Sequence, residues 1–248
     1  MRAIYIFWYR QVIKYLRTPA RVFGSLGQPL LYLVALGVGL SPVVPEVGGV
    51  SYINYLTPGI IGLTVLFTAV FTGIELVSDR RFGFLKETLV APVSRIWIYL
   101  GKSLGGATIS TIQGLLVLGL SFLFGFKLMS FGGFLLGLLV MFLVSLLFTM
   151  VGLLVATFIR DFQTFPIIIN FLILPLFFLS GAIFPLTNIP TSLKIITSIN
   201  PLTYGIDLLR GFLSGGSFYS HSLSFAVLFG LLVSFLFIGV KRFNKMTV

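Results

Sequence analysis

The chain has 248 residues, of which 57% are hydrophobic and 9% are charged, which excludes a water-soluble domain, where about 25% of residues carry a charge. Its mean hydropathy of +1.10 also excludes intrinsic disorder, because so apolar a chain cannot stay solvated as a coil. With no cysteine and a single histidine, His221, the chain has no disulfide framework, cysteine nucleophile or multi-histidine metal centre.

Residues 1–21 predict an amphipathic helix that lies flat at the membrane interface. Three basic residues, Arg10, Lys14 and Arg17, fall on one helical face, and Pro19 ends the helix. The opposite face carries Ile4, Trp8, Val12, Tyr15 and Leu16. Simple anchoring explains this pattern better than direct contact with a substrate.

Six long intervals without a charged residue follow, and each exceeds the roughly 20 residues needed to cross a bilayer. We place spans near 22–40, 54–77, 104–126, 131–158, 164–184 and 222–240. A β-barrel is excluded because 134–144 and 167–179 are apolar on every face, whereas barrel strands alternate. The sequence therefore predicts an all-α membrane protein with six transmembrane helices. They form a single domain over 1–248, with the bundle at 22–240 and a tail at 241–248.

The basic residues predict the orientation of this bundle. An even number of spans puts both termini on one side, which then holds all of the 17 basic residues except Lys127, Lys194 and Arg210. Basic residues collect on the cytoplasmic side, so both termini are expected there. This asymmetry also accounts for the net charge of +11 without a nucleic-acid partner.

Three connecting segments are larger than simple turns. Proline and glycine in 41–53 predict an irregular outer loop. The cytoplasmic segment 78–102 contains an apolar stripe between charged residues, which suits either docking of a soluble partner or a helix lying on the lipid surface. The outer segment 185–221 has apolar pieces too short to cross, which indicates short re-entrant helices between spans five and six.

Residues for enzyme chemistry are missing. The Gly-Lys-Ser at 101–103 lacks the first glycine of a phosphate-binding loop, because position 96 is Ile96. No acidic residue lies deep in a span, which argues against a membrane proton relay. Hydroxyls inside the spans are expected to bond the preceding turn or a neighbouring helix, and the Gly-x-x-x-Gly pairs at 101–105 and 133–137 permit close helix approach.

Two motifs resemble one family. The run RRFGFLKETLVAPVSRIWIYLGKSLGG (80–106) is similar to the signature of type-2 ATP-binding-cassette (ABC) export permeases, especially those of the daunorubicin-resistance kind. The run NPLTYGIDLLRG (200–211) resembles a second motif of that family, after the last but one span. Chain length, six spans and the amphipathic start fit the same family.

This resemblance implies roles for named residues. A coupling helix docked on an ATPase subunit would contain Gly83, Phe84, Leu85, Lys86 and Glu87. The turn back to the third span would be shaped by Pro92, Ser94 and Arg95. Transmission of movement would involve Glu75 and Asp79, although Glu75 could equally be an interfacial carboxylate paired with an arginine. The outer gate helices would contain Asn200, Pro201, Tyr204, Asp207 and Arg210. A structural Asp207–Arg210 salt bridge is favoured over a functional role, because the two are three residues apart on one helix.

The resemblance implies the membrane subunit of an exporter, without a catalytic site or cofactor of its own. Two permease copies, expected to be identical, would pair with two ATPase subunits that bring ATP and Mg, in the cell membrane of a prokaryote. With 27 Phe and no buried ion pair expected, the pathway favours a hydrophobic or amphiphilic cargo such as a drug or lipid, although lipid-facing phenylalanines would give the same count. The alternatives are a lipid-linked polysaccharide exporter of the same family and, in another class, an ATP-independent channel or scaffold.

Overall fold

The computed structural model of the protein describes residues 2–44, 46–47, 49–85, 87, 93–159, 161–186 and 189–246. The N-terminal part contains α1 (Arg2–Leu16), α2 (Pro19–Gly24), α3 (Gly27–Tyr32), the π-helical η1 (Leu33–Val38), β1 (Glu46–Val47) and β2 (Val50–Ser51). The central part contains α4 (Tyr52–Phe71), α5 (Gly73–Arg81), α7 (Arg95–Ser121), η2 (Phe122–Phe124) and α8 (Phe131–Phe158). The C-terminal part contains α9 (Thr164–Phe178), α10 (Thr191–Ile199), α11 (Pro201–Ser214) and α12 (His221–Asn244).

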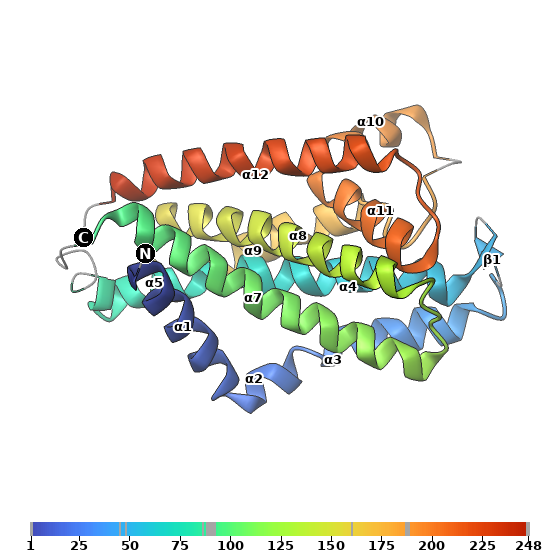
Figure 1. Ribbon diagram of the computed structural model, residues 1–248, viewed down its shortest axis with the longest axis horizontal. Helices are drawn as coiled ribbons and strands as arrows, with labels where there is room; N and C mark the ends of the chain where they lie inside the picture. Colours follow the sequence, from blue (N-terminus) through green and yellow to red (C-terminus); the bar gives the residue numbers. More distant parts are fainter. Residues whose placement is uncertain are drawn as a thin grey trace.

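Five helical segments are long and apolar enough to cross a membrane, which confirms a helical protein with several spans. They are Pro19–Val38, Tyr52–Arg81, Arg95–Phe124, Phe131–Phe158 and His221–Asn244. The predicted fifth span, 164–184, corresponds to α9, which has only 15 residues. At 1.5 Å per residue α9 rises about 22 Å, less than the roughly 30 Å of hydrocarbon. Six spans therefore stays a prediction. The path of the chain supports it, because α8 and α12 finish at the same end of the molecule, so the chain must return to the opposite end between them (Figure 1).

The outer loop differs from its prediction. Within the expected irregular turn 41–53, β1 and β2 form a short antiparallel hairpin that pairs Glu46 with Ser51 and Val47 with Val50. Gly49 has a φ of +81°, a conformation that glycine adopts without strain. The β-branched valines favour the extended backbone on either side, so the glycine-containing loop turns the chain into a hairpin.

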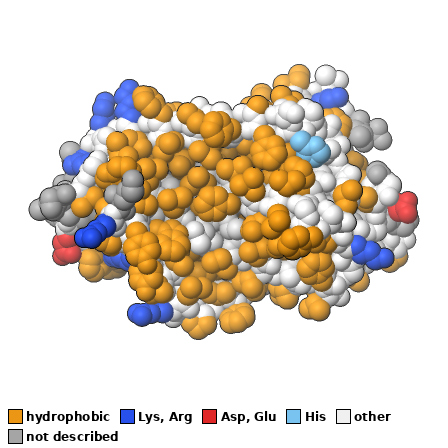
Figure 2. Space-filling view, in the orientation of Figure 1, with side chains coloured by type: hydrophobic (Ala, Val, Ile, Leu, Met, Phe, Trp, Pro, Cys, Tyr) orange, Lys and Arg blue, Asp and Glu red, His pale blue; other side chains and the backbone are white. Residues whose placement is uncertain are grey.

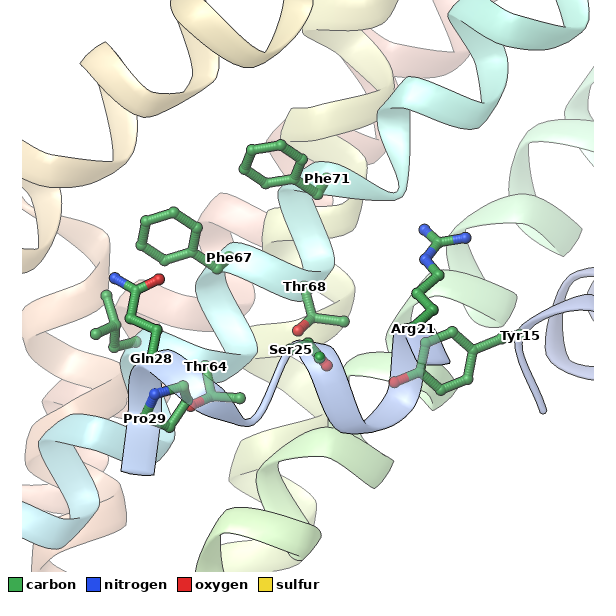
Figure 3. A pocket seen from close by; sticks show the side chains of 11 residues that line it. Tyr15, Arg21, Ser25, Gln28, Pro29, Thr64, Phe67, Thr68 and Phe71 are labelled. Atoms are coloured by element: carbon green, nitrogen blue, oxygen red, sulfur yellow. The ribbon is translucent and has the colours of Figure 1, made fainter. Parts of the chain in front are cut away.

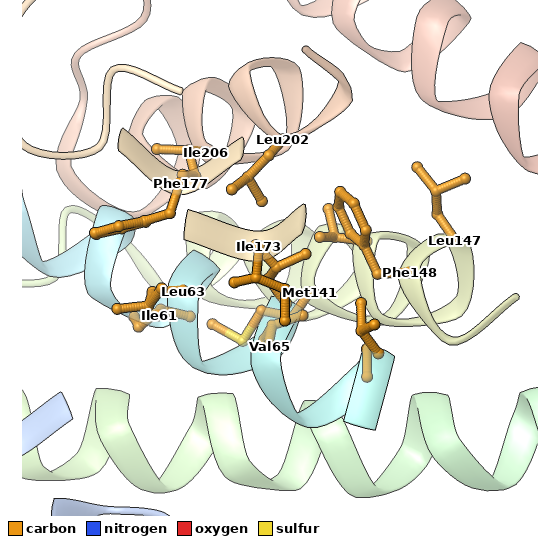
Figure 4. Close-up of a cluster of buried hydrophobic side chains, with 14 of the residues drawn as sticks. Ile61, Leu63, Val65, Met141, Leu147, Phe148, Ile173, Phe177, Leu202 and Ile206 are labelled. Atoms are coloured by element: carbon orange, nitrogen blue, oxygen red, sulfur yellow. The ribbon is translucent and has the colours of Figure 1, made fainter. Parts of the chain in front are cut away.

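The segment Tyr52–Arg81, which contains α4, is the most buried of the five: 72% of its most apolar 18 residues are buried, compared with 17% in His221–Asn244. Its residues Ile61, Leu63 and Val65 belong to the main hydrophobic core, together with Met141 of α8 and Ile173 of α9 (Figure 4). Side chains from four other elements thus surround α4, since Ile206 of α11 and Val117 of α7 belong to the same core.

The remaining apolar side chains face outward. Large hydrophobic residues are exposed on most helices of the described chain, among them Phe171 at 83% and Phe237 at 72%. Figure 2 shows hydrophobic side chains over the middle of one face, whereas charged side chains lie mainly toward the two ends of the long axis. Both termini lie at one of these ends, and β1, α10 and α11 lie near the other (Figure 1). This is the surface expected of a protein surrounded by lipid.

The amphipathic helix α1 is confirmed, but it packs on the bundle as well as facing outward. Val12 and Tyr15 are buried with Ile109 of α7, and the Trp8 indole donates a hydrogen bond of 3.0 Å to Thr108. Two glycines of α7 allow this close contact. A Cβ atom at Gly101 would lie 2.7 Å from the Cβ of Phe7, and one at Gly105 would lie 2.9 Å from the Cβ of Gln11. The 101–105 glycine pair is therefore a helix-packing motif, as predicted.

The other polar and small residues of the spans also behave as expected. Ser110 and Thr149 bond carbonyls one turn earlier, at 2.8 and 2.7 Å, and Thr111 also reaches Ser145 on the next helix at 3.2 Å. The 133–137 glycines face Phe212 and Leu213 of α11. The Thr111–Ser145 bond and the close approach at the glycines join neighbouring helices, whereas the other hydroxyls are satisfied within their own helix.

We predict that Gly101→Ala lowers the apparent melting temperature of the purified chain, because α1 must move away from α7 to admit a methyl group, at a cost of about 1–3 kcal/mol. Gly119→Ala on the same helix is the matched control, since nothing lies within 4 Å of its added Cβ. It should leave the melting temperature unchanged or raise it slightly. Equal behaviour of the two variants in a thermal unfolding assay would rule out the close α1–α7 contact.

Candidate functional site

The predicted coupling segment begins with a glycine-dependent turn. Helix α5 ends at Arg81, and Gly83 follows with a φ of +83°, which glycine tolerates better than other residues. The helical residues after it present different surfaces: Leu85 is fully buried, Phe84 is 49% exposed and Glu87 is exposed. Arg10 of α1 lies 6.0 Å from the centre of the Phe84 ring. The predicted residues Lys86 and Pro92 lie outside the described residues.

The predicted turn residues Ser94 and Arg95 have separate tasks. Ser94 is the N-cap of α7 and its carbonyl accepts a hydrogen bond of 3.0 Å from the Trp97 amide. Arg95 reaches the other end of the sequence, where its Nη1 donates to the carbonyls of Asn244 at 2.6 Å and Met246 at 3.0 Å. A cation at these carbonyls stabilises the end of α12. The sequence carries no local sign of this contact.

Glu75 is paired with cations of the N-terminal segment. Its Oε1 lies 3.0 Å from Nη1 of Arg21 and 4.0 Å from Nζ of Lys14. Glu75 is therefore paired with an arginine, and its part in the transmission of movement stays a prediction. The pair ties α5 to the junction between α1 and the first span.

Asp79 forms an ion pair that the sequence reading missed. Its carboxylate lies 2.5 Å from Nζ of Lys102 in the second turn of α7, and the side chains are only 13% and 10% exposed. The expectation that the chain has no buried ion pair is therefore wrong. Folding brings α5 and α7 together at this end of the two helices, so the two charges lie between them. We call Lys14, Arg21, Glu75, Asp79 and Lys102 the inner ionic cluster.

A polar centre lies deeper, around a glutamine in the third span. Gln113 is fully buried, and its amide nitrogen lies within hydrogen-bond distance of the Tyr15 hydroxyl, of the Val22 carbonyl at 3.0 Å and of Ser25 Oγ at 2.6 Å, which its two N–H groups share. An uncompensated amide is costly in an apolar medium, so these bonds fix the start of the first span against α7. The sequence signal was available, because Gln113 is a lone amide within a charge-free interval.

A cavity of about 220 Å³ lies between the first span and α4, beside this centre. Figure 3 shows Phe67, Phe71, Thr64 and Thr68 of α4 on one side of it. The opposite side carries Ser25, Gln28 and Pro29, with Tyr15 and Arg21 at one end (Figure 3). The walls thus combine aromatic rings with hydroxyls, an amide and a guanidinium.

The outer motif begins with a helix cap. The Asn200 side chain accepts a hydrogen bond of 3.0 Å from the Leu202 amide and donates one of 2.6 Å to the Leu176 carbonyl at the end of α9. Pro201 occupies the first turn of α11, where its missing N–H is harmless. The Tyr204 hydroxyl donates to the Ser198 carbonyl at 2.7 Å. Asn200, Pro201 and Tyr204 therefore fix α11 against α9 and α10, but a re-entrant path stays a prediction.

The predicted Asp207–Arg210 salt bridge is wrong. Asp207 accepts hydrogen bonds from the backbone amides of Phe218 and Tyr219, at 2.6 and 3.0 Å. Burial raises the pKa of the Asp207 carboxyl, while these two bonds and the Arg210 charge oppose that rise. Arg210 instead donates to the carbonyls of Tyr55 at 3.3 Å and Gly181 at 3.0 Å and lies 3.8 Å from the centre of the Tyr55 ring. Both side chains therefore bond backbone amides or carbonyls, which would otherwise be buried without a partner, instead of bonding each other.

The predicted site residues thus form two groups. The coupling segment with Glu75 and Asp79 lies toward the end that holds the termini, and the motif of α11 lies toward the opposite end (Figure 1). Sequence reasoning missed the partners Arg21, Lys102 and Tyr55, because each is more than 20 residues from the group it contacts.

We predict that Asp79→Leu destabilises the chain more than the double variant Asp79→Leu/Lys102→Met. The single change leaves a buried ammonium unpaired, which costs about 3–5 kcal/mol, whereas the double change leaves apolar groups. Thermal unfolding of the purified variants measures the difference, with Lys102→Met alone as the second reference. Additive effects of the two single changes would show that the ion pair is not coupled.

We also predict that Asp207→Ala releases the connection between α11 and α12, while Asp207→Asn has a smaller effect. Alanine leaves two amides without an acceptor, at about 1–3 kcal/mol each, and asparagine keeps one carbonyl oxygen. Hydrogen–deuterium exchange of a peptide covering 215–220 measures the release. If asparagine and alanine accelerate exchange equally, the charge of Asp207 matters more than its bonds to the amides.

Known proteins resemble this chain over most of its length. A sequence model of the family described as ABC-2 type transporter matches residues 2–214. The ycf38 protein of Cyanophora paradoxa, named as a transport permease, is 30% identical over 225 residues, which are 90% of this chain and 76% of that protein. Its counterpart in Porphyra purpurea is 34% identical over 198 residues, 78% of this chain and 68% of that protein. Nodulation protein J of Rhizobium leguminosarum bv. trifolii is 30% identical over 216 residues, 86% of this chain and 79% of that protein. The chain therefore belongs to the ABC-2 type transporter family, as a transmembrane transporter subunit.

Proposed function

We propose that this permease is the membrane half of an ATP-driven exporter. Two copies of the chain pair with two ATPase subunits, which bind ATP and Mg and hydrolyse the nucleotide. Their movement reaches the permease through the segment that contains Gly83, Phe84, Leu85 and Glu87. The permease lies in the cell membrane of a prokaryote with both termini in the cytoplasm, an orientation that the distribution of basic residues supports.

The observation that carries this proposal is the connection of the exposed coupling segment to the bundle. Phe84 and Glu87 are exposed, whereas Leu85 between them is fully buried. A few residues earlier, Glu75 and Asp79 hold α5 to the N-terminal segment and to α7 through the inner ionic cluster. A push on the exposed side chains would therefore move α5, α7 and the start of the first span together. Such a connection is what an exporter driven from outside the membrane needs.

A hydrophobic or amphiphilic molecule, such as a drug or lipid, is the cargo we propose. The 220 Å³ cavity supports it, because Phe67 and Phe71 offer aromatic surface while Arg21 and Gln28 offer polar groups to a head. A lipid-linked polysaccharide is the second candidate within the family, since such a cargo also joins an apolar chain to polar sugars. An ATP-independent channel or scaffold is the alternative from another class.

Co-purification from the native membrane tests the proposal. We expect a stoichiometric ATPase subunit with the unaltered chain and loss of stimulated ATP hydrolysis in Glu87→Lys, because the charge of the exposed contact is reversed. Glu87→Gln should give an intermediate loss. Lys245→Glu is the control, since it reverses an exposed charge on the tail at the same end of the molecule.

The variants must be compared at equal membrane insertion. A folded, dimeric permease that brings no ATPase under gentle detergent would favour the channel or scaffold. If Glu87→Lys still co-purified with the ATPase and transported normally, the proposed permease–ATPase complex would be retained, but Glu87 would not belong to the coupling contact.

A further inference from the structure

A second cavity, of about 370 Å³, lies on the outer side of the bundle. The hairpin contributes Val47 and Val50 to its walls, and Pro185, Leu186 and Phe218 add further apolar surface. Arg210 of α11 and Tyr55 of α4 contribute the polar groups. This cavity is separate from the one beside Gln113, with which it shares no described lining residue.

The guanidinium of Arg210 is unusual for a buried cation. Its residue is only 7% exposed, yet no carboxylate of the described residues lies within 4.0 Å of it. Arg210 donates through Nε to the Tyr55 carbonyl and through Nη2 to the Gly181 carbonyl, and its Cζ lies 3.8 Å from the centre of the Tyr55 ring. A guanidinium has five N–H groups. Within the described chain Nη1 has no hydrogen-bond acceptor, so N–H groups of a buried cation remain for a ligand in the cavity.

The other charges near this cavity make no direct ion pair with Arg210 within the described chain. Asp207, one turn earlier on α11, is occupied by the amides of Phe218 and Tyr219. Glu46 lines the cavity from the hairpin, where it is exposed to solvent. Lys194 lies 5.6 Å from the centre of the Phe218 ring and adds a second cation beside the cavity. A buried cation without a hydrogen-bonded anion is costly even when a carboxylate lies one turn away, and an oxyanion bound to Arg210 in the cavity would reduce that cost.

We propose that this outer cavity binds the oxyanion of an amphiphile, a phosphate or carboxylate, with Arg210 as its partner. The guanidinium fork matches two oxygens of such a group. Val47, Val50, Pro185 and Leu186 surround the apolar part of the molecule. The site does not depend on ATP or on a partner subunit, so it stands apart from the proposed export function.

Binding of short-chain lipids to the full chain in a nonionic maltoside detergent tests this site. The probes are dihexanoyl phosphatidic acid, dihexanoyl phosphatidylcholine and inorganic phosphate. Val50→Asp places a carboxylate in the cavity without altering the contacts of Arg210, and Val50→Asn is the matched neutral control. At an effective dielectric constant of about 20, one added charge at roughly 10 Å should weaken phosphatidic acid binding about tenfold, while asparagine leaves it within about twofold. Glu46→Gln should strengthen it.

Each outcome decides a point. If the chain binds phosphatidic acid selectively, and Val50→Asp weakens this binding while Val50→Asn does not, the site takes an anionic amphiphile. If inorganic phosphate binds equally well, the same oxyanion site also takes a free anion. Equal effects of Val50→Asp and Val50→Asn, or no preference for phosphatidic acid over phosphatidylcholine, overturn the proposal. Arg210→Gln should abolish binding, but only the Val50 pair is decisive if that variant fails to fold.

Discussion

The cost of placing a charge in hydrocarbon dominates this structure. A charged side chain at the middle of a bilayer costs several kcal/mol, so the chain keeps its charges near the ends of its helices. Most of them are exposed there, but a few lie between helices and need partners. The two ends meet this need differently. At the end with the termini, carboxylates pair with ammonium and guanidinium groups, whereas at the opposite end Asp207 and Arg210 are held by backbone groups and an aromatic ring.

The same cost explains how well the fold could be predicted. Charge-free intervals located the segments that became Tyr52–Arg81, Arg95–Phe124 and Phe131–Phe158, because a charge inside a span carries a large penalty. The hairpin at 46–51 was missed since its strands have only two residues each and no alternating pattern. The short α9 was overestimated, because apolar composition continues beyond Phe178, where the helix ends.

Site contacts were harder to predict than spans. Spacing along one helix suggested Asp207 with Arg210, but the contacts that formed join residues 11, 12, 29 and 155 positions apart. Such pairs depend on packing between helices, which a single sequence does not display. The polar residues of the third span show the same limit. Ser110 bonds a carbonyl of its own helix and Thr111 bonds its own helix and the next one, as expected, whereas Gln113 reaches two other segments.

The bond from Arg95 to the carbonyls of Asn244 and Met246 joins the first residue of α7 to the end of α12. Nearby, Tyr99 of α7 packs against Phe243 with their ring centres 5.8 Å apart. The third and last spans are therefore fastened at the end of the molecule where the coupling segment returns to the bundle. The start of α7 and the end of α12 are thus in direct contact, so a displacement of one would be passed to the other. Any movement of α7 in the proposed transport cycle would therefore also act on the end of α12.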